Sequence, residues 1–443
     1  MTVAWTRGAA GGAAGGAAEA ASGSGGRAGR RLALHGVLVA LLAGTTATFS
    51  PVSASAAASA ANASASGGSG AAGPAPREIR IGHLAPYSGP ASAYGVIGKA
   101  IGAWFDKVNA EGGVNGRRLV LVSRDDGYNP AKALEMTRRL VEQDEVLLVF
   151  NPLGTATNTA IRDYLNRRGV PQLFVASGAT KWGDPKGHPW TMGGQPSYQA
   201  EARIYARHIL ETRPSARIAV LYQNDDYGKD YLKGLRDGLG ERAAGMIVAQ
   251  ASYEVADPTI DSQMVSLKAS GADTFVNVTT PKFAAMAIRK AAELRWRPLH
   301  YLNNVSSGAR SVMLPAGPEN GVGVISAFYQ RDPSDPQWAD SPEYRDWLAW
   351  MRRWHPDGDV SDNLNVYGYN LAQLLVKVLV QAGDDLTRAN VMRQAANLDT
   401  SLPMLLPGVR VKTSPEDFFP FEQARLARWD GSTWVLFGPV YGD

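Results

Sequence analysis

The stretch VFNPLGTATNTAI, residues 149–161, passes from an apolar strand through a turn of small and hydroxyl side chains into a helix. The turn has no Lys for a nucleotide phosphate, and it contains no Cys, His or carboxylate. A Gly-Thr turn at a helix start exposes N–H groups and hydroxyl donors beside the positive end of the helix dipole. This pattern favours a small anion such as a carboxylate. The alternative is that Thr155 and Thr157 only cap the helix.

The same order of strand and helix recurs on both sides of this stretch. Apolar strands are predicted at EIRIGHLAP (78–86), RRLVLVSRDD (117–126), EVLLVF (145–150) and VPQLFVAS (170–177). The alternation restarts near Ala200, with strands at RIAVLY (217–222), GMIVAQASY (245–253), DTFVNV (273–278) and PLHYLN (298–303). Strands that alternate with helices of about 10 to 15 residues predict βαβ units and parallel sheets. We therefore expect two similar α/β lobes.

The last hundred residues have a different pattern. Two helices are predicted at EYRDWLAWMRRWH and NVYGYNLAQLLVKVLVQA, and Trp347, Trp350 and Trp354 follow helical spacing, which favours packing. Asp430-Gly431 lies between two apolar strands and predicts a hairpin turn.

Ligands of open parallel sheets gather at the carboxyl ends of the strands. Those positions read PYSGPASAYG (86–95), DDGYN (125–129), NPLGTATN (151–158), SGATKW (177–182), NDDYG (224–228), TTPK (279–282) and NNVSS (303–307). The SGAT turn supplies a second set of donors, and the rings of Tyr94 and Tyr227 could close over a ligand or belong to the scaffold. The paired acids at 125–126 and 225–226 are expected to cap loops.

The sequence offers little for catalysis, metals or nucleic acid. It has no GxSxG motif, no GxGxxG motif after the first strand, and no assembled nucleophile, base and orienting group. With no Cys and six scattered His, we expect no disulfide, no metal site and no bound cofactor. No cluster of basic and aromatic residues points to nucleic acid.

The first 77 residues differ from the rest in composition. Residues 1–56 are predicted to be a signal peptide within a low-complexity leader, and 57–77 a disordered linker. Arg27, Arg30 and Arg31 precede an apolar run over about 32–43, and small residues follow at 54–56. A membrane anchor is the alternative, but the run is shorter than the ~20 residues that cross a bilayer. The leader also carries +3 of the formal +4 charge. We expect a periplasmic protein.

At its strand ends the chain resembles the substrate-binding proteins of branched-chain amino-acid ABC importers, which are type I periplasmic binding proteins. The resemblance lies in IGHLAPYSGPASAYG, VNAEGGVNGRRLVLVSRDDGYNP, GVPQLFVASGAT, RIAVLYQNDDYGKD and LKASGADTFV, in that order. It implies two Rossmann-like lobes with parallel central sheets, joined by three hinge crossings around a ligand cleft. By similarity, lobe 1 is 78–196 plus 327–418, and lobe 2 is 197–326 plus 419–443.

The resemblance also implies ligand-binding residues. The carboxylate-binding turns fall on Leu153, Gly154 and Thr155 and on Gly178, Ala179 and Thr180, and the aromatic walls fall on Tyr94 and Tyr227. Thr280 and Asn304 are further candidates, each following a strand. The family usually has Ser at the position of Gly154. It also carries an acid for the ligand ammonium where this chain has Asn304 and Val305, so the ligand need not be an α-amino acid unless Asp225 or Asp226 compensates.

These patterns predict a receptor that is not an enzyme. It would bind a small carboxylate-bearing ligand, either a branched-chain or related amino acid or an organic or aromatic acid or amide. It would deliver the ligand, as a monomer, to the membrane permease of an ABC importer. The alternative is a ligand-sensing domain of the same fold that signals to a partner protein.

Overall fold

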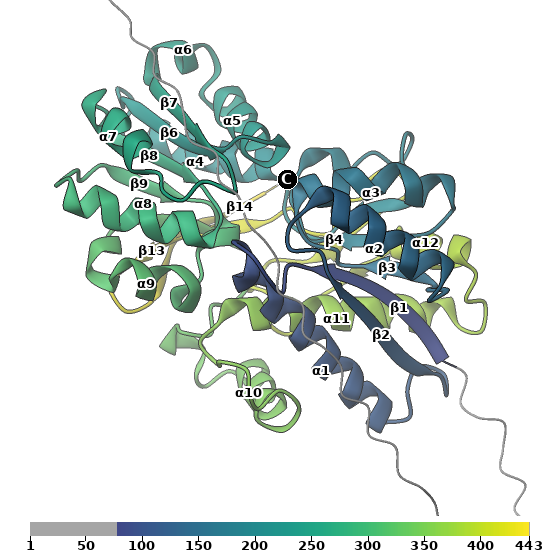
Figure 1. Ribbon diagram of the computed structural model, residues 1–443. Coiled ribbons are helices and arrows are strands. Elements are labelled where there is room, and N and C mark those ends of the chain that lie inside the picture. Colours follow the sequence, from purple (N-terminus) through teal and green to yellow (C-terminus); the bar gives the residue numbers. More distant parts are fainter. Residues whose placement is uncertain (1–77, 443) are drawn as a thin grey trace, which may run out of the picture. The chain divides into compact units, whose positions relative to one another are not determined.

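The computed structural model describes residues 78–442, so the predicted signal peptide and linker lie outside the described residues. Two central sheets organise this part of the chain (Figure 1). The first has the strand order β2-β1-β3-β4-β5, and the second has the order β14-β13-β10-β9-β8-β6-β7. The first sheet is parallel throughout, and the second is parallel from β7 to β10. The predicted mixed α/β fold with parallel central sheets is confirmed.

The first sheet and its helices form what we call the first lobe. Its strands are β1 (Glu78–Ala85), β2 (Arg118–Asp125), β3 (Leu148–Phe150), β4 (Gln172–Val175) and β5 (Thr191–Gly193). The helices between them are α1 (Val96–Ala110), α2 (Pro130–Glu142) and α3 (Thr155–Arg167). One buried cluster joins α1 to the later helix α11, and another joins α2 and α3 to the opposite face of the sheet. The sheet is therefore covered on both faces.

The second sheet and its helices form the second lobe. Its strands are β6 (Ile218–Gln223), β7 (Ile247–Tyr253), β8 (Thr274–Val278), β9 (Leu299–Leu302), β10 (Ile325–Phe328), β13 (Ala424–Trp429) and β14 (Trp434–Tyr441). Its helices are α4 (Tyr198–Thr212), α5 (Asp226–Leu239), α6 (Ala243–Met246), α7 (Asp261–Ala269), α8 (Pro281–Glu293) and α9 (Leu314–Ala316). The predicted hairpin is present, because β13 and β14 pair antiparallel with Trp429 opposite Trp434.

Three connections join the two lobes. The chain leaves the first lobe between β5 and α4, returns after β10, and leaves again between β12 and β13. The segment that returns contains α10 (Pro342–Trp354), α11 (Asn363–Ala382), α12 (Arg388–Ala395) and a small sheet of β11 (Asp399–Thr400) and β12 (Val411–Lys412). The sequence pattern predicted α10 and α11 but not α12. The lobe boundaries inferred from the resemblance stay a prediction.

The sequence explains several local features. Asn129 caps α2 through its side chain, with Pro130 in the first turn, and Asp225 caps α5 in the same way. Asp125 accepts hydrogen bonds from the backbone N–H groups of Tyr87 and Gly127. The prediction that these acids cap loops is therefore confirmed for Asp125 and Asp225, whereas Asp226 pairs with Lys181. Trp347 and Trp350 are buried, as their helical spacing indicated.

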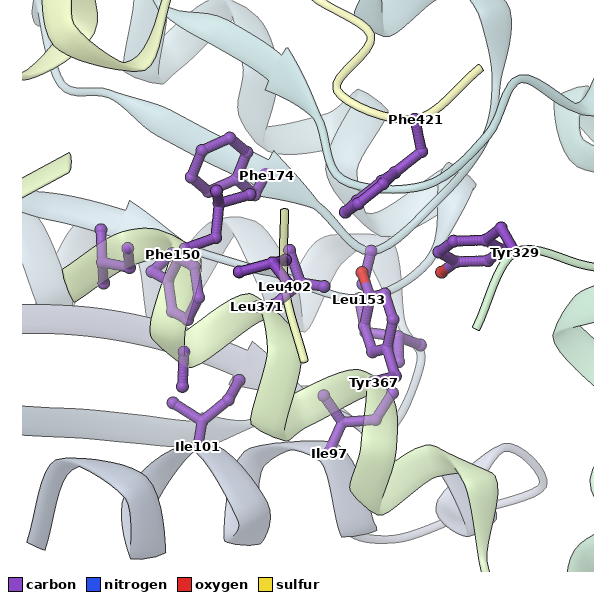
Figure 2. Close-up of a cluster of buried hydrophobic side chains, with 14 of the residues drawn as sticks. Ile97, Ile101, Phe150, Leu153, Phe174, Tyr329, Tyr367, Leu371, Leu402 and Phe421 are labelled. Atoms are coloured by element: carbon purple, nitrogen blue, oxygen red, sulfur yellow. The ribbon is translucent and has the colours of Figure 1, made fainter. Parts of the chain in front are cut away.

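The largest buried cluster packs the first sheet against α1 and α11 (Figure 2), and it continues into the second lobe through residues of α8 and β13. Phe150 and Phe174 meet edge to face, with ring centroids 6.4 Å apart. Figure 2 shows Tyr329 and Tyr367 at the other end of the cluster, near Leu153. In the described part of the chain, no helix is both long enough and apolar enough to cross a membrane.

Candidate functional site

A cavity lies between the two lobes at the carboxyl ends of their strands. Leu153 follows β3 in the first lobe, while Tyr227, Thr280 and Asn304 follow β6, β8 and β9 in the second. The strand orders reverse next to β1 and next to β6, and such reversals open a crevice in a parallel sheet. The cavity encloses about 810 Å³ of space between protein atoms, including space open to solvent.

Seven of the residues that line the cavity are aromatic. They come from both lobes and from the connections: Tyr94, Tyr128, Tyr198, Tyr227, Phe328, Tyr329 and Tyr367. The rings of Tyr198 and Tyr227 meet edge to face, with centroids 5.2 Å apart. Such a wall buries a large apolar surface while offering hydroxyl groups at its edge.

The tyrosine hydroxyls are not equivalent. The Tyr94 hydroxyl donates to the carbonyl of Val305 at 3.1 Å, which joins the first lobe to the second. The Tyr367 hydroxyl accepts from Asn151 Nδ2 at 2.8 Å and donates to the carbonyl of Gly194 at 3.2 Å. The Tyr227 hydroxyl is buried and has no hydrogen-bond partner. It is therefore available to a ligand.

Arg331 and Asp332 are the charged residues of the cavity lining. The Arg331 guanidinium points away, since Nη1 donates to Ser341 and Glu343, at 2.9 Å each, and Nε donates to the carbonyl of Leu405. Asp332 Oδ1 accepts from the backbone N–H and hydroxyl of Ser334, whereas Oδ2 is buried without a partner. Burial raises the pKa of Asp332 to about 6.

The structure brings six of the ten predicted residues into the cavity lining. These are Tyr94, Leu153, Gly154, Tyr227, Thr280 and Asn304. The other four, Thr155, Gly178, Ala179 and Thr180, do not line it. The Thr155 hydroxyl is buried at 2.7 Å from the Ser177 hydroxyl, and Ala176 takes the place beside the cavity that the prediction gave to 178–180.

The position of the second turn is thus corrected, and the reason is a contact between the lobes. Both the backbone N–H and the hydroxyl of Thr180 donate to Asp230 Oδ2, at 2.7 and 2.8 Å. Gln199 Nε2 donates to the other oxygen of Asp230 at 2.5 Å. A carboxylate from α5 therefore occupies the donors that the resemblance assigned to the ligand.

The glycine at 154 also has a structural reason. Its φ is 100°, in the region that favours glycine. A Cβ at this position would lie 2.6 Å from Tyr128 Cε2 and 2.7 Å from Thr157 Oγ1. The Tyr128 ring thus lies in the space where a serine side chain would extend.

The predicted substitutes for the missing acid do not reach the cavity. Asp225 caps α5 and also accepts from Gln223 Nε2, and Asp226 pairs with Lys181 at 2.5 Å. At Asn304 the backbone N–H donates to Glu201 Oε1 at 2.7 Å and the side-chain amide donates to the carbonyl of Ala327. Asp225 and Asp226 are therefore excluded as cavity acids.

A double-mutant cycle can measure the contact between Thr180 and Asp230. We expect Thr180→Val and Asp230→Ala to show a coupling of about 1 kcal/mol in the unfolding free energy of the ligand-free protein, since valine removes the hydroxyl bond to Asp230 and keeps the backbone N–H bond. The control cycle uses Lys181→Met and Asp226→Ala, because Asp226 is 60% exposed, and should give a few tenths of a kcal/mol. Equal couplings in the two cycles would contradict this expectation.

Sequence reasoning missed the residues that the connections contribute. Gln195 and Tyr198 lie at the first connection, residues 329–332 at the second, and Asn363 begins α11. Gln195 follows β5 and residues 329–332 follow β10, but neither strand was among those predicted from the sequence, so the strand-end rule did not select these residues. The cluster YQRDP, residues 329–333, directly after β10 was the available signal.

Comparison with known families and sequences gives a consistent result. The family model described as periplasmic binding protein matches residues 78–433. The Leu/Ile/Val-binding protein homolog 7 of Brucella abortus is 26% identical over 274 residues, which is 58% of this chain and 66% of that protein. The leucine-specific-binding protein of Salmonella typhimurium is 26% identical over 176 residues, 38% of this chain and 46% of that protein. The matches thus span less than two thirds of these relatives' length.

Solved structures share the fold. A branched-chain amino acid ABC transporter protein from Thermus thermophilus with bound valine has a TM-score of 0.75 at 17% identity, and the match covers 83% of this chain and 97% of that one. A fatty acid ABC transporter substrate-binding protein from Thermomonospora curvata has a TM-score of 0.66 at 19% identity, covering 83% and 93%. At these identities the likeness establishes the fold alone.

Proposed function

The chain belongs to the periplasmic binding protein family, and from this we propose that it is an extracytoplasmic solute receptor that delivers a small ligand to the permease of an ABC importer. The observation that carries the proposal is the cavity, which both lobes and the connections between them line at their strand ends. A ligand in this position contacts both lobes, so its binding energy favours the state in which they are together. A permease can then distinguish loaded from empty receptor.

The ligand we propose is the size of an amino acid, an aromatic or other organic acid, or an amide. Tyr94, Tyr227, Leu153, Thr280 and Asn304 would contact it, with Gly154 letting Tyr128 close the wall. The relatives named for leucine, isoleucine and valine support an apolar side chain, and the fatty-acid neighbour shows that the fold accepts other cargo. The aromatic wall fits an apolar body of either kind.

A sensor of the same fold is the alternative. Both functions need the cavity, so an uptake assay is required to distinguish an importer's receptor from a sensor. Deleting the gene of an importer's receptor abolishes uptake of the radiolabelled ligand, whereas deleting a sensor leaves uptake intact and removes a response. We propose export through the predicted signal peptide, a periplasmic location, a monomer and no enzymatic activity, in line with the family.

A thermal-shift screen tests the proposal directly. We expect a ligand at ~100 times its dissociation constant to add about 2.7 kcal/mol to the unfolding free energy, which appears as a clear rise in melting temperature. The panel is branched-chain and other amino acids, aromatic and aliphatic carboxylates, and small amides. A protein that no member stabilises would contradict the proposed function.

A further inference from the structure

We propose that Asp332 binds a protonated nitrogen of the ligand, so that the cargo is a small compound joining an amine to an apolar or aromatic body. The inference rests on the proposed receptor function and names the chemical class of its ligand. It also identifies where this chain places the acid that is missing at Asn304 and Val305. The argument begins with the surroundings of Asp332.

Asp332 lies four residues after the end of β10, in the second connection between the lobes. It is 5% exposed and lines the cavity. One carboxylate oxygen is held by Ser334, and this contact fixes the side chain. The other oxygen is buried without a donor, and a buried acceptor without a partner costs free energy. A ligand that donates to Oδ2 removes this cost.

Within residues 78–442, no cation pairs with Asp332. Its neighbour Arg331 donates instead to Glu343, Ser341 and the carbonyl of Leu405. Asp335 and Asp362 lie near enough to add negative potential, and together with burial they raise the pKa of Asp332 to about 6. The Asp332 carboxylate therefore lacks a positively charged partner, and a protonated amine of the ligand would provide one.

Two further acceptors line the same cavity without partners. Gln195 Oε1 is in the first connection and Asn363 Oδ1 is at the start of α11. Together with Asp332 they present unpaired oxygens from three separate segments. Nearby tyrosine faces also attract cations, which adds to the preference for an amine.

Other carboxylates are excluded by their contacts. Among the cavity-lining residues of the described chain, Asp332 is the only carboxylate. Glu201 does not line the cavity. Its carboxylate accepts hydrogen bonds from the hydroxyls of Tyr205 and Tyr231 and from the backbone N–H of Asn304. The nitrogen site is thus at the connection between the lobes.

Matched ligands that differ only in their charged groups test the proposal. One set is leucine, 4-methylpentanoate and 3-methylbutylamine, and the other is phenylalanine, 3-phenylpropanoate and 2-phenylethylamine, each titrated calorimetrically into the purified protein at pH 7.5. We expect nitrogen-bearing members of at least one set to bind at least tenfold more tightly than the acid. Asp332→Asn, which keeps an oxygen for Ser334, should weaken them about 10 to 100-fold.

Asp335→Asn is the matched control, because Asp335 is a buried acid three residues away that does not line the cavity. It should change the affinities less than threefold. If the acids bind as tightly as the amines, or if Asp332→Asn leaves amine affinity unchanged, the assignment of Asp332 is overturned and the receptor function stands. If no member of either set binds, and none of the wider thermal-shift panel does, both proposals fail.

A pH profile distinguishes the charge of Asp332 from its packing. Below pH 6 the unliganded carboxyl becomes protonated, so amine affinity should fall by up to tenfold per pH unit and a proton should be released on binding. Asp362, whose pKa burial also raises to about 6, faces the same region, as do Asp335, Arg331 and Tyr344. These groups are kept in Asp332→Asn, so this variant should have a much shallower profile. An equally steep profile in that variant would overturn the proposal.

Discussion

Replacing Gly228 by Ala is expected to destabilise the protein by about 3 kcal/mol or more. Gly228 lies in the first turn of α5, immediately after Tyr227. A Cβ there would be 2.0 Å from the backbone oxygen of Gln223, the last residue of β6. Real Cβ atoms do not approach other atoms so closely, and a backbone oxygen cannot rotate away. Overpacking of this kind costs typically 1–3 kcal/mol, and here the start of the helix has to move.

The same movement should affect the site, because the Tyr227 ring lines the cavity and packs on Tyr198 and Tyr231. Urea unfolding measures the loss of stability, and the thermal-shift screen measures the loss of ligand response. Gly245→Ala is the control, since a Cβ at position 245 would have no atom within 4 Å and this position lies in the short helix α6. It should be neutral or stabilising by up to about 1 kcal/mol. Equal stability of the two variants would show that β6 and α5 can separate without cost.

Glu201→Gln is expected to stabilise the protein relative to the unchanged chain by about 2 to 3 kcal/mol more at pH 8 than at pH 5. Glu201 is 5% exposed in α4, and burial raises the pKa of its carboxyl to about 7, although three hydrogen bonds oppose this rise. The unfolded chain ionises near 4.5, so the folded state binds the proton more tightly. A pKa raised in an acid means that stability is greatest at low pH and is lost as pH rises from about 4.5 through 7.

Glutamine imitates the protonated acid. It keeps an oxygen for the backbone N–H of Asn304, and its amide can donate to the Tyr231 hydroxyl, so the variant should lack this pH dependence. The measurement is urea unfolding of both proteins at pH 5 and pH 8. Other buried groups, such as His83, cancel in the difference because both chains contain them.

Glu211→Gln on the same helix is the control for Glu201. Glu211 is 50% exposed and pairs with Arg207, so its substitution should shift stability equally at both pH values. If Glu201→Gln also shifts stability equally, Glu201 is ionised in the folded protein at pH 5 and its burial is compensated by the tyrosines.

Hydrophobic period and strand-helix alternation were sufficient to predict the α/β class and most elements. EIRIGHLAP and DTFVNV are each apolar enough to be buried on both faces, as β1 and β8 are. The capping residues Asn129 and Asp225 mark the positions where α2 and α5 begin. Helix α12 was missed because RANVMRQA is short and mainly polar. Its position depends on packing against α11, which no local pattern reports.

The site was predictable where a residue follows a strand. Tyr94, Leu153 and Tyr227 are in this class, and the rule depends only on the geometry of parallel sheets. Tyr329 and Asp332 also follow a strand, but that strand, β10, was not among the predicted ones, so the rule did not select them. Thr180 shows the opposite case: its donors have the right chemistry, but Asp230, fifty positions away, occupies them.

That contact between Thr180 and Asp230 also sets the order of events for an incoming molecule. We expect the lobes to separate when a molecule of amino-acid size enters the cavity, which breaks this contact between them, and the contact can re-form afterwards. Entry is then gated by a step of the protein alone. The observed association rate should rise with ligand concentration and level off at the rate of opening, well below the diffusion limit, and departure of the cargo should wait for the same step.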